Sequence, residues 1–289
     1  MRYSSFDQFL AKAKAGLAKG PIAIVLAEDD TEVDTTVRHH LDIGFGQLIL
    51  LADAQLVLPA DVEGQIHRVD VQASDAGLLQ RCVNRVIEAA PDAWIFYCYN
   101  AEYLFFPFLE TRQIGEMLAF HMEERREAFL CYVVDIYAEN LTDYPNAVSL
   151  DTAHMDSVGY YALAREDPAN NWAKRDRQLD FYGGLRWRFE EYVPWTRRRI
   201  DRIALFRAKP GLILRENFTL SDEEMNTYAC PWHNNLTAAI ASFRTAKALR
   251  ANPGSRFAIN TFLWQNSVPF EWHSQQLMDM GLIEPGQWF

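Results

Sequence analysis

PDAWIFYCYNAEYLFFPF, residues 91–108, is the stretch of sequence that decides the fold. Its centre, Trp94–Tyr99, is a continuous apolar run without a charge, which is typical of a strand buried on both faces of a parallel sheet. The run ends at two polar residues, Asn100 and Glu102. Because ligands of open α/β sheets bind outside the carboxyl ends of the strands, this pair is a candidate binding site. A strand-end turn whose polar side chains merely face water is the alternative.

Shorter strands are expected before this one, with helical patterns between them. The first two of these strands run into acidic residues, Glu28 and Asp53. The order strand, helix, strand, strand, helix, strand indicates an α/β sheet whose carboxyl edge gathers Glu28, Asp53 and Asn100. The expected strands are 22–27, 47–51 and 66–71, and the expected helices are 33–41 and 78–87, the second one capped by Ser74-Asp75.

Beyond the central stretch the pattern becomes less regular. A helix at 113–126 and an apolar strand at 128–136 are followed by a long, partly irregular excursion over 137–171. The basic run Trp195–Arg202 is either a solvated basic face or a phosphate site. Residues 231–250 are expected to form an Ala-rich helix that opens at Pro231-Trp232-His233-Asn234-Asn235.

Composition excludes several classes of protein. With 49% hydrophobic and 23% charged residues, the 289-residue chain is expected to be an ordinary soluble protein with a full core. Its net charge of −11 argues against nucleic acid as a partner, because that binding needs a basic surface. Residues 1–20 lack an apolar signal region and suggest an amphipathic leader helix, so neither secretion nor a transmembrane segment is expected. The scattered cysteines, Cys82, Cys98, Cys131 and Cys230, fit reduced residues of a cytoplasmic protein.

Two segments resemble a known enzyme family. Arg81–Leu104, RCVNRVIEAAPDAWIFYCYNAEYL, looks like the segment of family 2-type glycosyltransferases of the GT-A fold that leads into their Asp-x-Asp motif. Ala27–Phe45, AEDDTEVDTTVRHHLDIGF, is similar to the opening segment of one branch of that family. Asp53 falls where the family places an aspartate that holds the nucleotide base. The resemblance covers about residues 21–136.

The chain departs from this family at the Asp-x-Asp motif. The two aspartates fall on Tyr99 and Ala101, which leaves Glu102 as the only carboxylate, with Asn100 beside it. Mg²⁺ and Mn²⁺ prefer carboxylate oxygens, so one Glu and one Asn make a weak site. Glu102 and His233 are the metal ligands we expect, and the dependence of ligand binding on Mn²⁺ or Mg²⁺ should be weak.

The resemblance implies a GT-A-like (Rossmann-like) α/β fold, with a mixed, mostly parallel sheet flanked by helices and a C-terminal α-rich extension. The expected divisions are a leader helix at 1–20, a nucleotide-sugar-binding domain at 21–230 and a helical extension at 231–289. No internal repeat or low-complexity linker marks these boundaries.

The implied function is the inverting transfer of a sugar from a nucleotide-sugar donor to a saccharide or another hydroxyl acceptor. Donor contacts are expected from five residues: Asp53 holds the base, Arg81 approaches a phosphate, Asn100 and Glu102 lie at the diphosphate or the sugar, and Glu28 lies beside them. The general base is expected to be a carboxylate that follows the Gly-rich turn at 181–184, either Glu190 or Glu191.

Three other functions are alternatives to this one. A catalytically inactive GT-A-like binding or scaffold protein is the principal alternative, because the Asp-x-Asp motif is incomplete and fold does not imply function. A Rossmann-type dinucleotide enzyme lacks its GxGxxG motif after the first strand, where Glu28-Asp29-Asp30 would repel a pyrophosphate. A Ser or Cys hydrolase would need a GxSxG elbow or a Cys placed at a helix start, and the sequence indicates neither.

Overall fold

The computed structural model of the protein describes residues 1–17, 20–229 and 234–288. The chain divides into two compact units, each built from three separate segments. Unit 1 comprises 1–103, 111–130 and 203–226, and unit 2 comprises 104–110, 131–202 and 227–289. This division differs from the one expected at residues 20 and 230, which stays a prediction.

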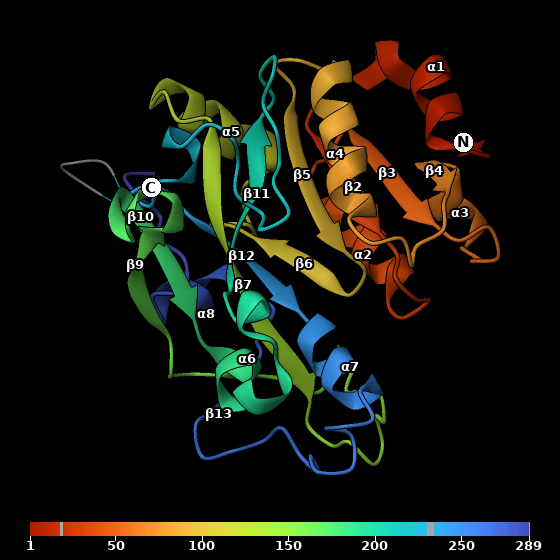
Figure 1. The fold of residues 1–289 in the computed structure, drawn as a ribbon. Helices are drawn as coiled ribbons and strands as arrows, with labels where there is room; N and C mark the ends of the chain where they lie inside the picture. The colour runs from red at the N-terminus through yellow and green to blue at the C-terminus, as the bar shows by residue number, and fades with distance from the viewer. Residues whose placement is uncertain (18–19, 230–233, 289) are drawn as a thin grey trace. The chain divides into compact units, whose positions relative to one another are not determined.

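Unit 1 is built on a mostly parallel sheet with the strand order β1-β4-β3-β2-β5-β11 (Figure 1). The first five strands are parallel to their neighbours, and β11 is antiparallel to β5. The charge-free run is the buried strand β5, with the bounds expected from the sequence. The strands are β1 (Arg2–Tyr3), β2 (Ile22–Leu26), β3 (Gln47–Ala52), β4 (His67–Asp70), β5 (Trp94–Tyr99) and β11 (Asp201–Arg207).

Helices flank this sheet on both faces. The crossovers β2-α2-β3 and β4-α4-β5 run in opposite directions across the sheet, and since such connections are right-handed, α2 and α4 lie on opposite faces. Helix α1 packs on α4 (Figure 1). The mixed α/β fold with flanking helices is therefore confirmed. The helices of unit 1 are α1 (Phe6–Leu17), α2 (Val33–Asp42), α3 (Ala60–Glu63), α4 (Leu78–Ala89), α5 (Ile114–Glu123) and the 3₁₀ turn η4 (Glu224–Asn226).

One helix start in unit 1 differs from the expectation. Ser74-Asp75 was expected to cap α4, but the N-cap residue is Gly77, whose φ of 70° lies in the left-handed region. No side chain caps this end. Glycine reaches this φ without a steric penalty, so the turn tightens just before the helix and the polar pair stays outside it.

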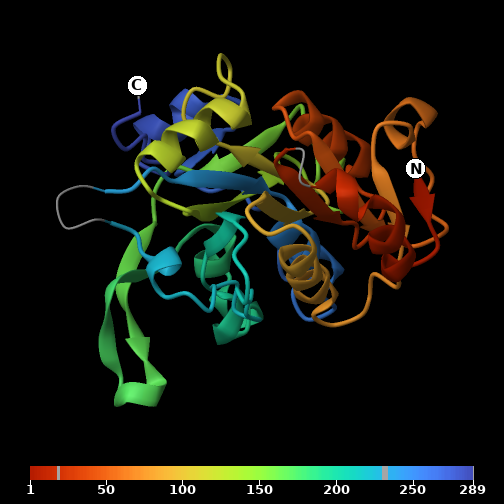
Figure 2. The same cartoon turned by 90° about the horizontal axis from the view of Figure 1, so that it is seen from above.

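Unit 2 has a smaller sheet and a separate two-stranded ribbon. In the sheet, β12 runs parallel to β7, β8 runs antiparallel to β7, and β13 pairs with β8. The antiparallel strands β9 and β10 form the ribbon, drawn in green in Figure 2. The strands of unit 2 are β7 (Ala128–Ala138, in unit 2 from residue 131), β8 (Ala153–Asp156), β9 (Tyr161–Asp167), β10 (Ala173–Tyr182), β12 (Ala238–Ser242) and β13 (Ser267–Pro269). Strand β6 (Glu102–Phe105) begins in unit 1 and belongs to unit 2 from residue 104.

Short helices complete unit 2. Helices α6 and α7 pack on an apolar cluster that includes Tyr137, Leu185, Leu249 and Phe262. The helices are α6 (Gly184–Arg188), α7 (Arg244–Ala251) and α8 (Ser274–Asp279), and the 3₁₀ turns are η1 (Pro168–Asn170), η2 (Glu190–Tyr192) and η3 (Trp195–Arg197).

The helix expected over 231–250 is wrong over the described residues 234–243. Residues Ala238–Ser242 form strand β12, and the helix α7 begins only at Arg244. Every residue of β12 is buried, and each is paired with β7 in register from Ala238 opposite Cys131 to Ser242 opposite Asp135. Alanine favours helices, but pairing within a buried sheet outweighs this small preference. The C-terminal region is therefore mixed α/β rather than α-rich.

Two histidines are buried as neutral groups in unit 1. His40 stacks on Phe96, with ring centroids 5.0 Å apart, and His121 stacks on Phe129 at 3.8 Å. Loss of hydration on burial lowers the pKa of each imidazole to about 3. In the unfolded chain these two imidazoles bind protons below about pH 6.5, whereas in the folded protein they do so only near pH 3. Stability is therefore lost as the pH falls from 6.5 towards 3.

We expect His121→Gln to make unit 1 less sensitive to acid. The variant removes one group that takes up a proton only on unfolding, so the slope of unfolding free energy against pH should fall by up to about 1.4 kcal/mol per pH unit. Urea unfolding at several pH values between 7 and 4 measures this slope. His154→Gln is the control, because that side chain is only partly buried. An unchanged slope in His121→Gln would contradict the conclusion that His121 is buried as a neutral group.

Candidate functional site

The carboxyl edge of the unit 1 sheet contains the point where the strand order reverses. From β2 the chain moves outward to β3 and β4, and then returns across the sheet to β5, on the other side of β2. Open α/β sheets have a crevice at such a switch point, between the ends of the two strands. Here β2 is followed by the exposed acidic turn Glu28-Asp29-Asp30, and β5 is followed by Asn100.

Asn100 joins the ends of β2 and β5. Its Oδ1 accepts a hydrogen bond from the backbone N–H of Glu28 at 2.9 Å. Its Nδ2 donates to Oδ1 of Asp29 at 2.6 Å and to the carbonyl of Thr31 at 2.8 Å. The side chain is fully buried, so burying its amide without these partners would cost about 1–3 kcal/mol per unmade bond. Its hydrogen bonds thus hold the acidic turn against the end of β5.

Glu102 closes a tight turn after β5. Its Oε2 accepts a hydrogen bond from the backbone N–H of Tyr99 at 2.9 Å, and the side chain is fully buried. Between them Ala101 has a φ of 57°, in the left-handed region, and its N–H donates to Oγ1 of Thr36 at 2.8 Å. A non-glycine residue with such a φ is uncommon and is held here by its surroundings. The turn is fixed from both sides.

Oδ1 of Asn100 and Oε2 of Glu102 both accept hydrogen bonds from backbone N–H groups. Tyr99 and Ala101, where the Asp-x-Asp aspartates would fall, are buried, and Glu102 is turned towards the backbone. Within the described ranges no group of three or more His, Cys, Asp or Glu side chains is placed to hold a metal ion. His233 lies outside the described residues. The metal roles of Glu102 and His233 stay predictions.

Asp53 and Arg81 lie at the same edge of the sheet and are exposed. Asp53 directly follows β3, and its Oδ1 accepts only a long hydrogen bond, 3.3 Å, from the N–H of Ala73. Arg81 lies on the first turn of α4, which begins at the carboxyl edge, and its Nη1 donates to the carbonyl of Ala76 at 2.5 Å. Its Nη2 lies 3.9 Å from Asp75. Both charged groups are accessible to a ligand.

Glu190 and Glu191 belong to η2 in unit 2, and both are exposed. Oε2 of Glu190 pairs with Nη1 of Arg198 at 2.9 Å. Arg198 comes from the basic run Trp195–Arg202, whose meaning the sequence left open between a solvated face and a phosphate site. At this position the run makes an ion pair within unit 2.

A second group of polar residues in unit 2 was not expected from the sequence. Asp156, at the end of β8, accepts three hydrogen bonds at Oδ1: from Tyr137 Oη at 2.5 Å, from Arg188 Nη1 at 2.9 Å and from Trp264 Nε1 at 2.8 Å. Its Oδ2 is buried and has no hydrogen-bond partner among the described residues. Burial raises the pKa of Asp156, and the Tyr137 hydroxyl and Arg188 oppose this rise.

Asp135 of β7 lies in the same group. Its Oδ2 accepts a hydrogen bond from the N–H of Arg186 at 3.3 Å, and its Oδ1 lies 3.5 Å from Nε of that residue. Burial raises its pKa against the charge of Arg186. Gly184 allows this approach, since a Cβ there would lie 3.1 Å from Oδ2. The group therefore joins β7, β8 and α6 by buried charge pairs.

One signal in the sequence could have revealed this group. Asp135 interrupts the apolar run AFLCYVVDI, and a charge inside a buried strand needs a partner. The partner, Arg186, lies 51 residues further along the chain, just beyond the glycine pair. No short spacing and no periodic pattern in the sequence connects Asp135 with Arg186.

The comparisons with known proteins leave the family open. Neither the scan against family models nor the search of curated proteins finds a match for this chain. No helix in the described part of the chain has the length and apolar character needed to span a bilayer.

We expect Asp156→Ala to destabilise unit 2 strongly. The change leaves the Arg188 guanidinium, 11% exposed, without its carboxylate and removes the acceptor of Tyr137 and Trp264. Breaking a buried ion pair from one side costs about 3–5 kcal/mol. Urea unfolding followed by circular dichroism measures the loss. Asp151→Ala, an exposed position just before β8, is the control, and equal stabilities of the two variants would contradict the assignment.

Proposed function

We propose that this chain is a glycosyltransferase whose unit 1 binds the nucleotide part of a nucleotide-sugar at the carboxyl edge of its sheet. The observation that carries the proposal is the switch point between β2 and β5, with exposed Asp53 at the end of the neighbouring strand β3. The resemblance of Arg81–Leu104 to family 2-type glycosyltransferases supports the same assignment. A GT-A-like fold and a cytoplasmic location are part of this proposal.

The acidic character of this edge suits the nucleoside better than the diphosphate. Carboxylates accept hydrogen bonds from base N–H groups and ribose hydroxyls, which are the roles we assign to Asp53 and Glu28. The diphosphate needs positive charge, and Arg81 is the exposed cation nominated for it. The side chains of Asn100 and Glu102 hydrogen-bond to the backbone of the strand ends. We therefore propose that they mainly fix the shape of the site and contact the donor only secondarily.

The proposed reaction is a single displacement with inversion. A carboxylate accepts the proton of the acceptor hydroxyl as its oxygen forms a bond to the anomeric carbon, while the bond from that carbon to the diphosphate oxygen breaks. The negative charge then rests on the released nucleoside diphosphate, which an Arg side chain stabilises. Glu190 and Glu191 are the proposed bases. Both are exposed, and Glu190 would have to leave its ion pair with Arg198.

A second candidate is a GT-A-like protein that binds a nucleotide without turnover. It is favoured by the hydrogen bonds that commit Asn100 and Glu102 to the fold. Both candidates share the nucleotide site and differ in chemistry alone. Incubating the protein with nucleotide-sugars and a broad acceptor panel, and measuring the released nucleoside diphosphate, separates them.

We expect Asp53→Ala to weaken nucleotide binding and Asp42→Ala to leave it unchanged. Asp42 is an exposed aspartate of the same unit, but it ends α2, at the opposite edge of the sheet. Loss of one hydrogen-bonding carboxylate should cost about 1–3 kcal/mol, or roughly a 5- to 150-fold rise in Kd. Isothermal titration calorimetry with the five common nucleoside diphosphates and their sugars measures this.

The same titrations, repeated with and without Mn²⁺, test the metal. We expect only a small change in Kd, because the Asp-x-Asp positions carry Tyr99 and Ala101. The proposal fails if the protein binds no nucleotide, or if the two aspartate variants bind equally well. A large gain in affinity with Mn²⁺ would show that the site holds a metal after all.

A further inference from the structure

Three aromatic rings stack on one another at the root of the β9–β10 ribbon in unit 2. Tyr161 and Tyr182 lie directly opposite each other in the antiparallel register, which places both side chains on the same face. Their ring centroids are 5.3 Å apart and their planes differ by 19°. The Trp195 ring continues the stack, 5.9 Å from Tyr182 and tilted by 24°. We call Tyr161, Tyr182 and Trp195 the aromatic stack.

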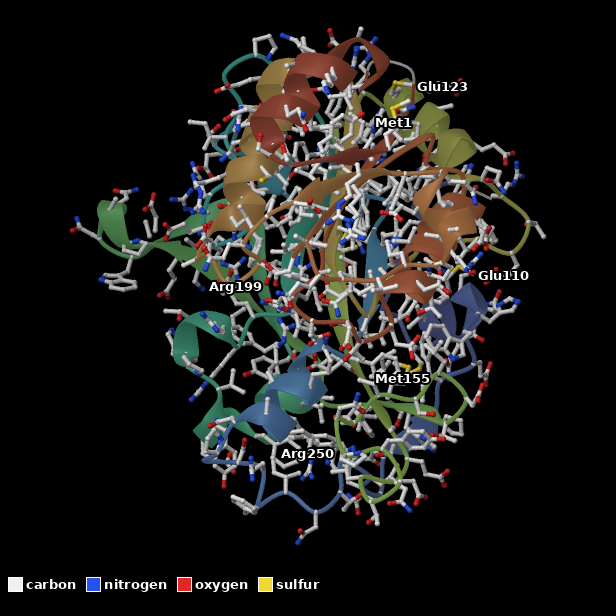
Figure 3. The ribbon with its side chains drawn as sticks, turned by 90° about the vertical axis from the view of Figure 1, so that its right-hand side faces the viewer. Met1, Glu110, Glu123, Met155, Arg199 and Arg250 are labelled. Atoms are coloured by element: carbon white, nitrogen blue, oxygen red, sulfur yellow. The ribbon has the colours of Figure 1, made fainter. Side chains whose placement is uncertain are left out.

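The backbone holds the stack in place. Tyr182 forms a bridge with Arg199 (labelled in Figure 3), which brings the chain that follows Trp195 alongside β10. Nε of Arg199 lies 3.1 Å from Oδ1 of Asp180. Arg198 lies over the Trp195 ring, 5.6 Å from its centroid, and its Nε donates to the carbonyl of Val193 at 3.0 Å. A surface fixed in this way loses little conformational entropy when a ligand binds.

The outer rings of the stack are open to solvent although its middle ring is not. Tyr182 is 6% exposed, whereas Tyr161 is 45% exposed and Trp195 is 65% exposed. Single exposed apolar residues are common on protein surfaces, but here two exposed aromatic rings are held in order by stacking on a buried third. Aromatic residues held rigidly at a surface are typical of binding sites.

The charges beside the stack have both signs. Arg198 and Glu190 form an ion pair there, and the exposed residues Arg197 and Glu191 belong to the same two turns, η3 and η2. A surface for single-stranded nucleic acid would combine such rings with a basic groove, and a membrane-binding surface would be rich in Lys and Arg. Neither description fits this mixture, in a chain of net charge −11.

A saccharide has the complementary chemistry. A pyranose ring presents a flat face of C–H groups, which packs on an aromatic ring, and a rim of hydroxyls, which both donate and accept hydrogen bonds. Side chains of both signs at the edge of the stack match such a rim. We propose that Tyr161 and Trp195 bind the acceptor of this enzyme and that this acceptor is an oligosaccharide. The role of this saccharide as the acceptor rests on the proposed function, whereas the binding of a saccharide does not.

The test is binding of the purified chain to an array of defined oligosaccharides, without nucleotide. We expect the wild-type protein to bind a subset of them, and Trp195→Ala and Tyr161→Ala to bind that subset about tenfold more weakly, a loss typical of removing one stacking ring. Trp195→Phe should retain most of the affinity. Trp172→Ala is the matched control, because this tryptophan is 64% exposed but lies at the far end of the ribbon, between η1 and β10.

Further readouts separate this inference from the proposed function. Saccharide binding without any nucleotide binding would support the stack and overturn the glycosyltransferase. If both activities exist, Trp195→Ala should raise the KM for the oligosaccharide and leave the Kd for the nucleotide unchanged. The inference fails if the wild-type protein binds no saccharide, or if all variants bind alike. Self-association in sedimentation velocity that Trp195→Ala abolishes would also overturn it, because the stack would then be a contact between copies of the chain.

Discussion

The Asn100 amide is the interaction on which the carboxyl edge of the unit 1 sheet depends. It joins the ends of β2 and β5 at the position where the strand order reverses, by three hydrogen bonds made in full burial. The two strand ends and the acidic turn are therefore held in one arrangement before any ligand arrives. Glu102 fixes the turn that follows by binding the N–H of Tyr99. The acidic turn and Asp53 are exposed at this edge.

The sequence predicts β5 well and β12 badly, for one physical reason. Trp94–Tyr99 combines aromatic and β-branched residues with the absence of charge, so local preference and burial agree. Ala238–Ser242 is rich in alanine, which favours a helix, and only its pairing with β7 makes it a strand. That pairing joins residues more than 100 positions apart in the chain, and no local pattern can report it.

The candidate sites show the same limit. Asn100 and Asp53 could be assigned to one edge of a sheet because parallel strands end together. The role of Asn100 as a structural bridge could not be predicted, because it depends on the backbone at Glu28 and Thr31, some 70 residues earlier. In unit 2, Tyr161 and Asp156 lie in the excursion 137–171 that the sequence predicts to be irregular, whereas Asp135 lies in an expected strand. The contacts of these residues depend on tertiary pairing, which the local sequence does not contain.

The division of the chain into two interleaved units has a consequence for biosynthesis. Unit 1 needs β11, which lies after almost all of the first long stretch of unit 2, so the N-terminal half cannot complete its sheet while it leaves the ribosome. Its β5 edge stays unpaired until residues 205–207 have been made. An unpaired strand edge invites association with other chains, so the nascent protein is exposed to wrong pairing over this interval. No single cut in the chain can release either unit as a continuous fragment.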